Sequence, residues 1–173
     1  MINFFKELKD NCLVFLSSLE KLLQEHRLLT FTNSLVLDHI CFRVSDVSSY
    51  VKYQNKFLNI SKLLIESKVN GRLISTYKLN DPIIWESRVI SVIELPEPKS
   101  VNNYNTGFEH AEFVTDLSFE KIIKKFPNLN FSKKGMHKEI NPELKVQLSK
   151  EIAIKFHHQP LEEVIEFEKT QVN

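Results

Sequence analysis

Several features that mark specialised classes of protein are scarce in this sequence, and cysteine is the first of them. The chain has two cysteines, Cys12 and Cys41, which are too few and too far apart for a disulfide framework or a zinc knuckle. Cys12 falls in a helix-like pattern and Cys41 in a strand-like pattern. We therefore expect two buried thiols in a reducing compartment.

The chain also lacks an excess of charge of one sign. Its 23 lysines and arginines nearly balance 22 aspartates and glutamates, which gives a formal net charge of +1 at pH 7. A nucleic-acid-binding protein usually has a strongly basic face, so we expect no nucleic-acid partner. The paired lysines at 124–125 and 133–134 fit a solvated surface better than a phosphate site.

Long hydrophobic runs are missing as well. No stretch approaches the roughly 18 apolar residues of a membrane-spanning helix. The first ten residues contain acids and no long apolar run, unlike a signal peptide. We expect a cytoplasmic protein with no membrane association, present as a monomer or a homodimer.

The sequence does contain a repeated motif. Residues 37–44 and 108–115 both resemble a strand with an acid, then a histidine, then apolar residues at alternate positions. An aspartate and a helix-like stretch follow each copy. His39 and His110 are the two motif histidines, separated by about half the chain. Such a duplication predicts two similar modules packed together, with both histidines facing one site.

The order of predicted elements is the same around both copies of the motif. The first half is predicted to contain, in order, strand, helix, strand, strand and strand, at 35–44, 47–58, 61–69, 72–79 and 87–95. The second half repeats that order at 107–115, 118–126, 129–133, 143–149 and 151–158. Asp46 is the expected cap of the first helix, and Asp116 or Ser118 opens the second. Asn70-Gly71 predicts a hairpin turn, and Pro82 a loop.

Both ends of the chain are predicted to be helical. Apolar residues between Phe4 and Leu23 fall mostly at spacings of three and four, so 1–30 is expected to form a helical extension. Asp10 or Asn11 would divide it into two helices, and the polar stretch from Thr30 ends it. A final helix is expected over 160–169, with proline at its first position.

These patterns predict an α+β fold within a single domain over 1–173, for which 42% hydrophobic and 26% charged residues are ordinary. Two βαβββ modules, at 35–98 and 106–158, would pair so that a helix covers one face of each sheet. The other faces would form a curved mixed-sheet cup. A cup floor made by two sheets is a natural ligand site, so a small molecule is the expected partner.

Strand alternation predicts which side chains face the cup. In the first strand Ile40 and Phe42 lie on the apolar face that should pack on a helix, which turns His39 toward the cup. The same rule turns His110 inward in the matching strand. In the last strand it turns His157 inward and His158, its obvious competitor, away.

Glu94 ends a strand that is apolar on both faces, so alternation does not orient it. Imidazole and carboxylate ligands suit divalent Fe, Mn, Co, Ni or Zn. The candidate metal ligands are therefore His39, Glu94, His110 and His157. Each has a plainer alternative: a hydrogen-bonded core histidine, or a glutamate that caps a loop. His26 and His137 are expected at the surface.

At these residues the chain resembles a known superfamily. Asp38-His39, Glu94-Leu95 and Glu109-His110 are similar to the motifs of the vicinal oxygen chelate superfamily, which includes glyoxalase I, methylmalonyl-CoA epimerase and extradiol dioxygenases. Within it, the chain most resembles the YecM family of uncharacterised bacterial proteins over nearly its full length. The segment Lys155-Phe156-His157-His158-Gln159-Pro160-Leu161 belongs to that resemblance.

The resemblance implies paired βαβββ modules and a divalent metal that holds vicinal substrate oxygens and stabilises an enolate or oxyanion. Carried across, His39, Glu94 and His110 match ligand positions one to three. Many members place a glutamate fourth ligand in the last strand. Here that strand has Lys155, His157 and His158 instead, so the sequence departs from the pattern at the fourth ligand.

Three functions compete at this stage. The first is a metal-dependent isomerase, epimerase, lyase or dioxygenase, with Glu112 as general base and an anionic group of the substrate bound by Arg43, Gln147 and Lys155. For these residues the alternative is a solvated or salt-bridged role. The second function is a ligand-binding protein without chemistry. The third is an interaction protein that presents Phe4, Phe5 and Leu8, although those residues fit packing on the sheet better.

Overall fold

The structure is a computed structural model that describes residues 3–99 and 105–171. The chain divides into two compact units, each built from two segments of sequence. Unit 1 consists of residues 1–17 and 39–109, and unit 2 consists of residues 18–38 and 110–173. The boundaries fall inside the first helix and inside the two strands that carry the repeated motif. None of the helices in the described ranges is both long and apolar enough to cross a membrane.

The N-terminal helix α1 (Phe4–Glu25) is continuous, so the predicted break at Asp10 or Asn11 is wrong. Asp10 is held within the helix, because its carboxylate accepts a 2.6 Å hydrogen bond from Lys6 one turn earlier. The polar stretch that was expected to end the helical region forms a second short helix, α2 (Leu29–Asn33). Cys12 is fully buried in α1, and burial raises the pKa of its thiol to about 12.

The end of α1 is a Schellman motif in which arginine stands where glycine is usual. The amide of Leu28 donates to the Leu23 carbonyl at 2.7 Å, and that of Arg27 donates to the Gln24 carbonyl at 3.0 Å. Leu23 and Leu28 are both buried, which supplies the apolar contact of this motif. Arg27 has a φ of 59°, a left-handed conformation that costs energy for any residue with a side chain.

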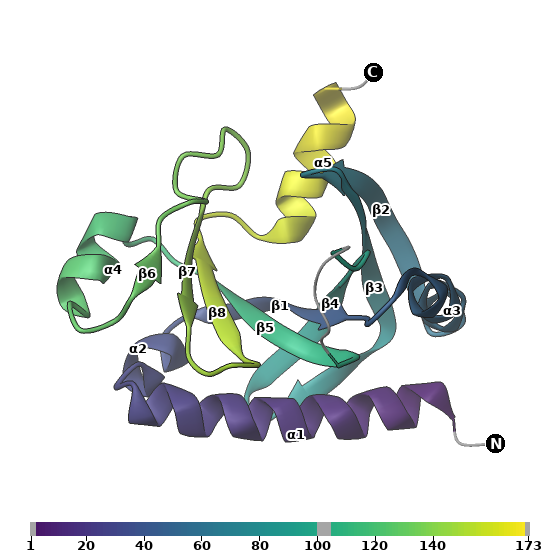
Figure 1. Cartoon of the computed structure of the whole chain (residues 1–173), viewed down its shortest axis with the longest axis horizontal. Helices are drawn as coiled ribbons and strands as arrows, with labels where there is room; N and C mark the ends of the chain where they lie inside the picture. Colours follow the sequence, from purple (N-terminus) through teal and green to yellow (C-terminus); the bar gives the residue numbers. More distant parts are fainter. Residues whose placement is uncertain (1–2, 100–104, 172–173) are drawn as a thin grey trace. The chain divides into compact units, whose positions relative to one another are not determined.

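Unit 1 contains the first predicted module in the predicted order. Its elements are β1 (Val36–Arg43), α3 (Val47–Leu58), β2 (Ser61–Val69), β3 (Arg72–Trp85) and β4 (Arg88–Pro96). The strand order is β2-β3-β4-β1, with β1 parallel to β4 and the other neighbours antiparallel. α3 packs against β2 and β4, and Figure 1 shows it beside this group of strands. The hairpin between β2 and β3 turns at Asn70-Gly71, as predicted.

The core of unit 1 is rich in aromatic side chains. Phe57 of α3 stacks on Tyr77 of β3 with ring centroids 5.1 Å apart, and Phe4 of α1 lies edge-on to Phe57 at 5.5 Å. Leu8 is also buried. Phe4 and Leu8 therefore serve the packing of unit 1, which removes the main support for a partner-binding N-terminal helix.

Pro82 lies inside β3 and not in a loop, which corrects the prediction. β3 is 14 residues long, and its pairing with β4 changes register between Lys78 and Ile83. Proline cannot donate a hydrogen bond to a neighbouring strand, so it is tolerated where the ladder is interrupted. The interruption depends on pairing with β4, which local sequence patterns do not reveal.

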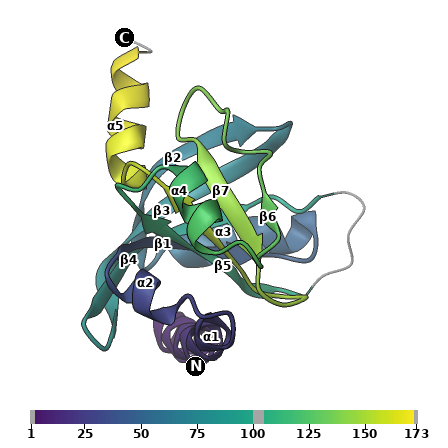
Figure 2. The ribbon, with the colours of Figure 1, turned by 90° about the vertical axis from the view of Figure 1, so that its left-hand side faces the viewer.

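Unit 2 repeats the order of elements with shorter strands. Its elements are β5 (Gly107–Val114), α4 (Phe119–Lys125), β6 (Phe131–Ser132), β7 (Glu143–Gln147), β8 (Ala153–His157) and α5 (Leu161–Gln171). The strand order is β5-β8-β7-β6, with β5 parallel to β8 and the other pairs antiparallel. In Figure 2, α4 is drawn in front of β7. Ser118, not Asp116, caps α4, and α5 begins one residue after Pro160.

We expect Asp46 to stabilise the start of α3. Its carboxylate accepts hydrogen bonds from the hydroxyl groups of Ser45, Ser48 and Ser49 and from the Ser49 amide. Replacing it by alanine should lower the melting temperature by about 2–4 °C at pH 7. Asp46→Asn is the matched control, because it keeps the cap and removes the charge.

The same carboxylate gives this stabilisation a pH dependence. Hydrogen bonds from Ser48, Ser49 and Ser45 hold the pKa of Asp46 well below its ordinary value. Its contribution should therefore be complete above the unfolded pKa of about 3.9 and be lost as the pH falls toward the lowered folded value. Thermal melts of wild type and Asp46→Asn at pH 7 and pH 3 measure this, and an equal difference at both pH values would contradict it.

Candidate metal centre

In unit 1 the pairing of two parallel strands brings His39 close to Glu94. Cys41 of β1 is paired with Glu94 of β4, and His39 lies two residues before Cys41 on the same face of the strand. The Nε2 atom of His39 is 3.8 Å from a carboxylate oxygen of Glu94. The histidine is buried and the glutamate is 17% exposed. Two of the four predicted ligands are thus neighbours within one unit.

Arg43, predicted to bind substrate, lies farther along β1. Its Nη1 is 3.8 Å from the carboxylate of Glu109, and its Nε donates to the Asn105 carbonyl at 3.3 Å. Both contacts belong to unit 1. The guanidinium is mostly buried and already engaged with protein groups, so it would have to exchange a contact before it bound a ligand.

In unit 2 the second motif histidine lies against Glu112. The Nε2 atom of His110 is 3.0 Å from Oε1 of Glu112, and both residues are buried on β5. Alternation places them on one face of the strand, as the sequence predicted. A carboxylate at this distance fixes the orientation of the imidazole, and it would compete with a metal ion for Nε2 of His110.

Lys155 completes this cluster from the neighbouring strand. It is paired with Glu112 in the parallel β5–β8 ladder, and its Nζ donates to Oε1 of Glu112 at 2.6 Å. The same ammonium is 3.5 Å from the carboxylate of Glu143, which in turn lies 3.0 Å from Lys138. A short charge-assisted hydrogen bond between a partly buried ammonium and a buried carboxylate is among the stronger polar contacts in a protein.

His157 is fully buried at the end of β8, and its two ring nitrogens have different surroundings. The Nδ1 atom is 2.5 Å from the carbonyl oxygen of Gln159. The Nε2 atom is 3.6 Å from Asp38 and 4.0 Å from Glu112, measured to carboxylate oxygens. A proton on Nδ1, donated to a backbone carbonyl, leaves the Nε2 lone pair toward the carboxylates. This is the orientation typical of a metal-ligating histidine.

His158 lies on the opposite side of β8. Its ring stacks on Phe119 with centroids 4.4 Å apart, and its Nδ1 is 2.8 Å from the Thr115 carbonyl. Adjacent residues of a strand point to opposite faces, so this difference from His157 is the one that alternation predicted. Of these two neighbouring histidines, His157 is the one that lies near acidic side chains.

Gln147 is not brought into this cluster. Its amide donates to the carbonyls of Ser149 and Ile152 and so holds the turn between β7 and β8. His137 is exposed, whereas His26 is half-buried with its Nε2 3.0 Å from the Leu148 carbonyl. A turn-binding amide and a ring bonded to backbone have structural roles in unit 2.

Two carboxylates near the histidines were missed by the sequence analysis. Asp38 was quoted as the motif acid but given no role, although it lies beside His157 and also accepts a 2.9 Å hydrogen bond from the Leu161 amide at the start of α5. Glu143 was not singled out. Its pairing with His157 across β7 and β8 depends on register, for which the sequence carries no local signal.

The donor set suits a divalent transition metal. Each unit offers a buried imidazole nitrogen within 4.0 Å of a carboxylate oxygen: His39 with Glu94, and His157 with Asp38. Nitrogen and oxygen donors of this kind bind iron, manganese, cobalt, nickel and zinc. The anchored Nδ1 of His157 adds the hydrogen bond that orients such a ligand. The residues present therefore fit the group that the resemblance implies.

Comparison with known proteins identifies the family and the fold. Protein YecM of Escherichia coli (strain K12) is 29% identical over 151 residues, which cover 79% of this chain and 80% of that protein. The solved structure of the structural genomics protein EC4020 matches with a TM-score of 0.78 and 25% identity, over 94% of this chain and 92% of that one.

A more distant match is methylmalonyl-CoA epimerase in complex with methylmalonyl-CoA and NH4+. Its TM-score is 0.50 at 14% identity, over 73% of this chain and 96% of the epimerase. The predicted α+β fold class with two βαβββ modules is confirmed by the order of elements, and the epimerase shares this fold. The family model described as "YecM protein" matches residues 5–168, and the chain therefore belongs to the YecM family.

Proposed function

We propose that the protein is a divalent-metal-dependent enzyme that acts on a small oxygenated substrate, as an isomerase, epimerase, lyase or dioxygenase. The observation that carries the proposal is the pairing, in each unit, of a buried histidine with a carboxylate: His39 with Glu94 and His157 with Asp38. Burying the two imidazole rings costs free energy, which binding of a metal ion would offset. The epimerase of similar fold, which holds a CoA ester, supports the class of ligand.

In this proposal the ligands of the metal are His39, Glu94, His110 and His157. The chain passes between the units at Asp38–His39 and again at Glu109–His110. Each motif histidine is therefore a covalent neighbour of an acid that belongs to the other unit.

The metal, when bound, would act as a Lewis acid toward a carbonyl or enolate oxygen of the substrate. Glu112 is the proposed general base, a carboxylate held in a buried position that would take a proton from a substrate carbon. Lys155 holds Glu112 in place through its 2.6 Å hydrogen bond and supplies a positive charge beside it. Arg43, at the outer end of β1, is proposed to bind an anionic group of the substrate.

A second candidate is a ligand-binding protein that performs no reaction. The observation that favours it is the state of Glu112, which already contacts both Lys155 and His110 at 3.0 Å or less. Both contacts are made to Oε1, so the carboxylate already balances a charge of the protein. The two candidates differ in whether Glu112 takes a proton from the substrate, and ligand binding by the second need not depend on a metal.

We expect the double substitution His39→Ala/His110→Ala to abolish metal binding. The measurement is elemental analysis of protein purified without a histidine tag and reconstituted in turn with Fe²⁺, Mn²⁺, Ni²⁺ and Zn²⁺. Wild type should retain close to one equivalent of one of these ions, and the double variant only background. His158→Ala is the control, because that ring packs on Phe119. A wild-type protein that retains no metal after every reconstitution would rule out the proposal.

We expect Lys155→Met to destabilise the protein by about 3 kcal/mol, because it leaves the buried Glu112 without its shortest charged contact. The double variant Lys155→Met/Glu112→Leu should recover most of the loss, since it also removes the carboxylate. Urea unfolding of the wild type, both single variants and the double variant gives the coupling energy. Additive losses would show that the ammonium does not serve to balance the charge of Glu112.

A further inference from the structure

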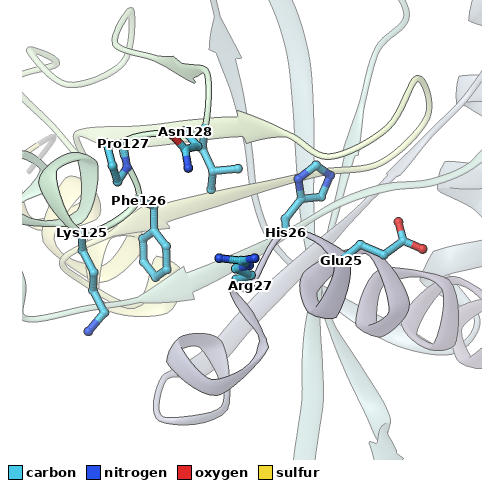
Figure 3. Close-up of a pocket in the computed structure, with 8 residues that line it drawn as sticks. Glu25, His26, Arg27, Lys125, Phe126, Pro127 and Asn128 are labelled. Carbon is cyan, nitrogen blue, oxygen red and sulfur yellow. The ribbon is translucent and has the colours of Figure 1, made fainter.

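An open pocket in unit 2 lies where the end of α1 meets the segment that follows α4 (Figure 3). Its volume is about 360 Å³. Basic and apolar side chains dominate its wall, and those used below are His26, Arg27, Lys125, Phe126 and Leu129. The candidate metal ligands are not among its lining residues. Any ligand of this pocket would therefore be separate from the proposed metal-dependent reaction.

Arg27 lines this pocket and has a strained backbone conformation. Its φ of 59° lies in the left-handed region, at the position of a Schellman motif where glycine is usual. Strain of this kind persists in proteins mainly where the residue has another role. Among the described residues, the Arg27 side chain has no hydrogen-bond or ion-pair partner. Its role in the folded chain is thus not explained by internal contacts.

The cationic groups of the pocket flank an aromatic ring. In Figure 3 the ring of Phe126 lies between Lys125 and Arg27. The ammonium of Lys125 also lies 5.8 Å from the ring centroid of Phe31, which is not one of the lining residues. The guanidinium of Arg27 beside an aromatic ring favours a ligand that carries a compact negative charge and an apolar part.

Two other polar residues of the wall, His26 and Glu25, also bear on where a negatively charged ligand would bind. His26 contacts the Leu148 carbonyl through Nε2 at 3.0 Å, which fixes its ring at the edge of the pocket. The carboxylate of Glu25, the acidic residue of the wall, lies beyond His26 on the side away from Lys125 in Figure 3. Lys125 and Glu25 therefore lie at opposite ends of the wall, with Arg27 between them.

We propose that this pocket binds a small phosphate monoester with an apolar organic group, with Arg27 holding the phosphate, Lys125 adding positive charge at the rim, and Phe126 and Leu129 contacting the organic part. The paired lysines at 124–125, which suggested a solvated surface in the sequence, thereby divide into one pocket residue and one surface residue. The proposal does not depend on the metal centre, because its residues and its ligand class are different.

The test is a titration of the ¹⁵N-labelled full chain with phenyl phosphate, followed by amide chemical shifts. We expect saturable shifts at residues 25–28 and 125–129. Arg27→Ala should weaken binding at least about tenfold, since it removes a charge-assisted hydrogen bond, and Lys125→Gln should weaken it to a smaller extent. Lys124→Gln should leave binding unchanged. Inorganic phosphate should bind more weakly than phenyl phosphate, and benzoate more weakly still.

Stability provides a second readout that a purely structural role would not produce. Arg27→Gly should raise the melting temperature of the ligand-free protein by about 2–4 °C, because glycine relieves the left-handed strain, and should also lose phenyl phosphate binding. Arg27→Ala should lose binding without that gain. The proposal is overturned if wild type shows no saturable shifts, if the shifts lie elsewhere, if benzoate binds as well as phenyl phosphate, or if Arg27→Ala binds as tightly as wild type.

Discussion

A parallel strand pair inside each unit is the constraint on which the candidate metal centre depends. In unit 1, β1 pairs in parallel with β4, and in unit 2, β5 pairs in parallel with β8. Each motif strand thus lies beside the last strand of its own module. Parallel neighbours require a crossover connection, which the helix and hairpin of each module provide. The register of these pairs sets His39 beside Glu94 and Glu112 beside Lys155.

The strand register also explains how polar side chains can be buried at the candidate metal centre and still have polar partners. Side chains at the same height on neighbouring parallel strands meet on one face of the sheet, so a buried acid finds a basic group at a fixed distance. Lys155 and Glu112 are paired residues of one ladder. Removing either partner would leave a charge in a poorly solvated position, which is more costly than the loss of the contact itself. A substitution at one of these site residues should therefore also change the stability of the fold.

The sequence predicts features that depend on local pattern and misses those that depend on register. The Asn70-Gly71 turn, the Asp46 cap and the opposite directions of His157 and His158 each follow from a few neighbouring residues, and the structure contains them. Pro82 was misplaced because its tolerance depends on a break in pairing with a distant strand. Glu143 was missed because its neighbours are set by the β7–β8 ladder.

The division of the chain has a consequence for the order of folding during synthesis. Each unit consists of two segments separated by many residues, and α1 contributes to both. Unit 1 can be completed once residue 109 has left the ribosome, but residues 18–38 must then wait for the segment after residue 110. Contacts between distant segments form slowly, because a long loop must first be closed. The apolar residues Leu19, Leu23 and Leu28, which are buried in the folded chain, would lack the second segment of their own unit during that interval, and exposed apolar surface of this kind favours aggregation.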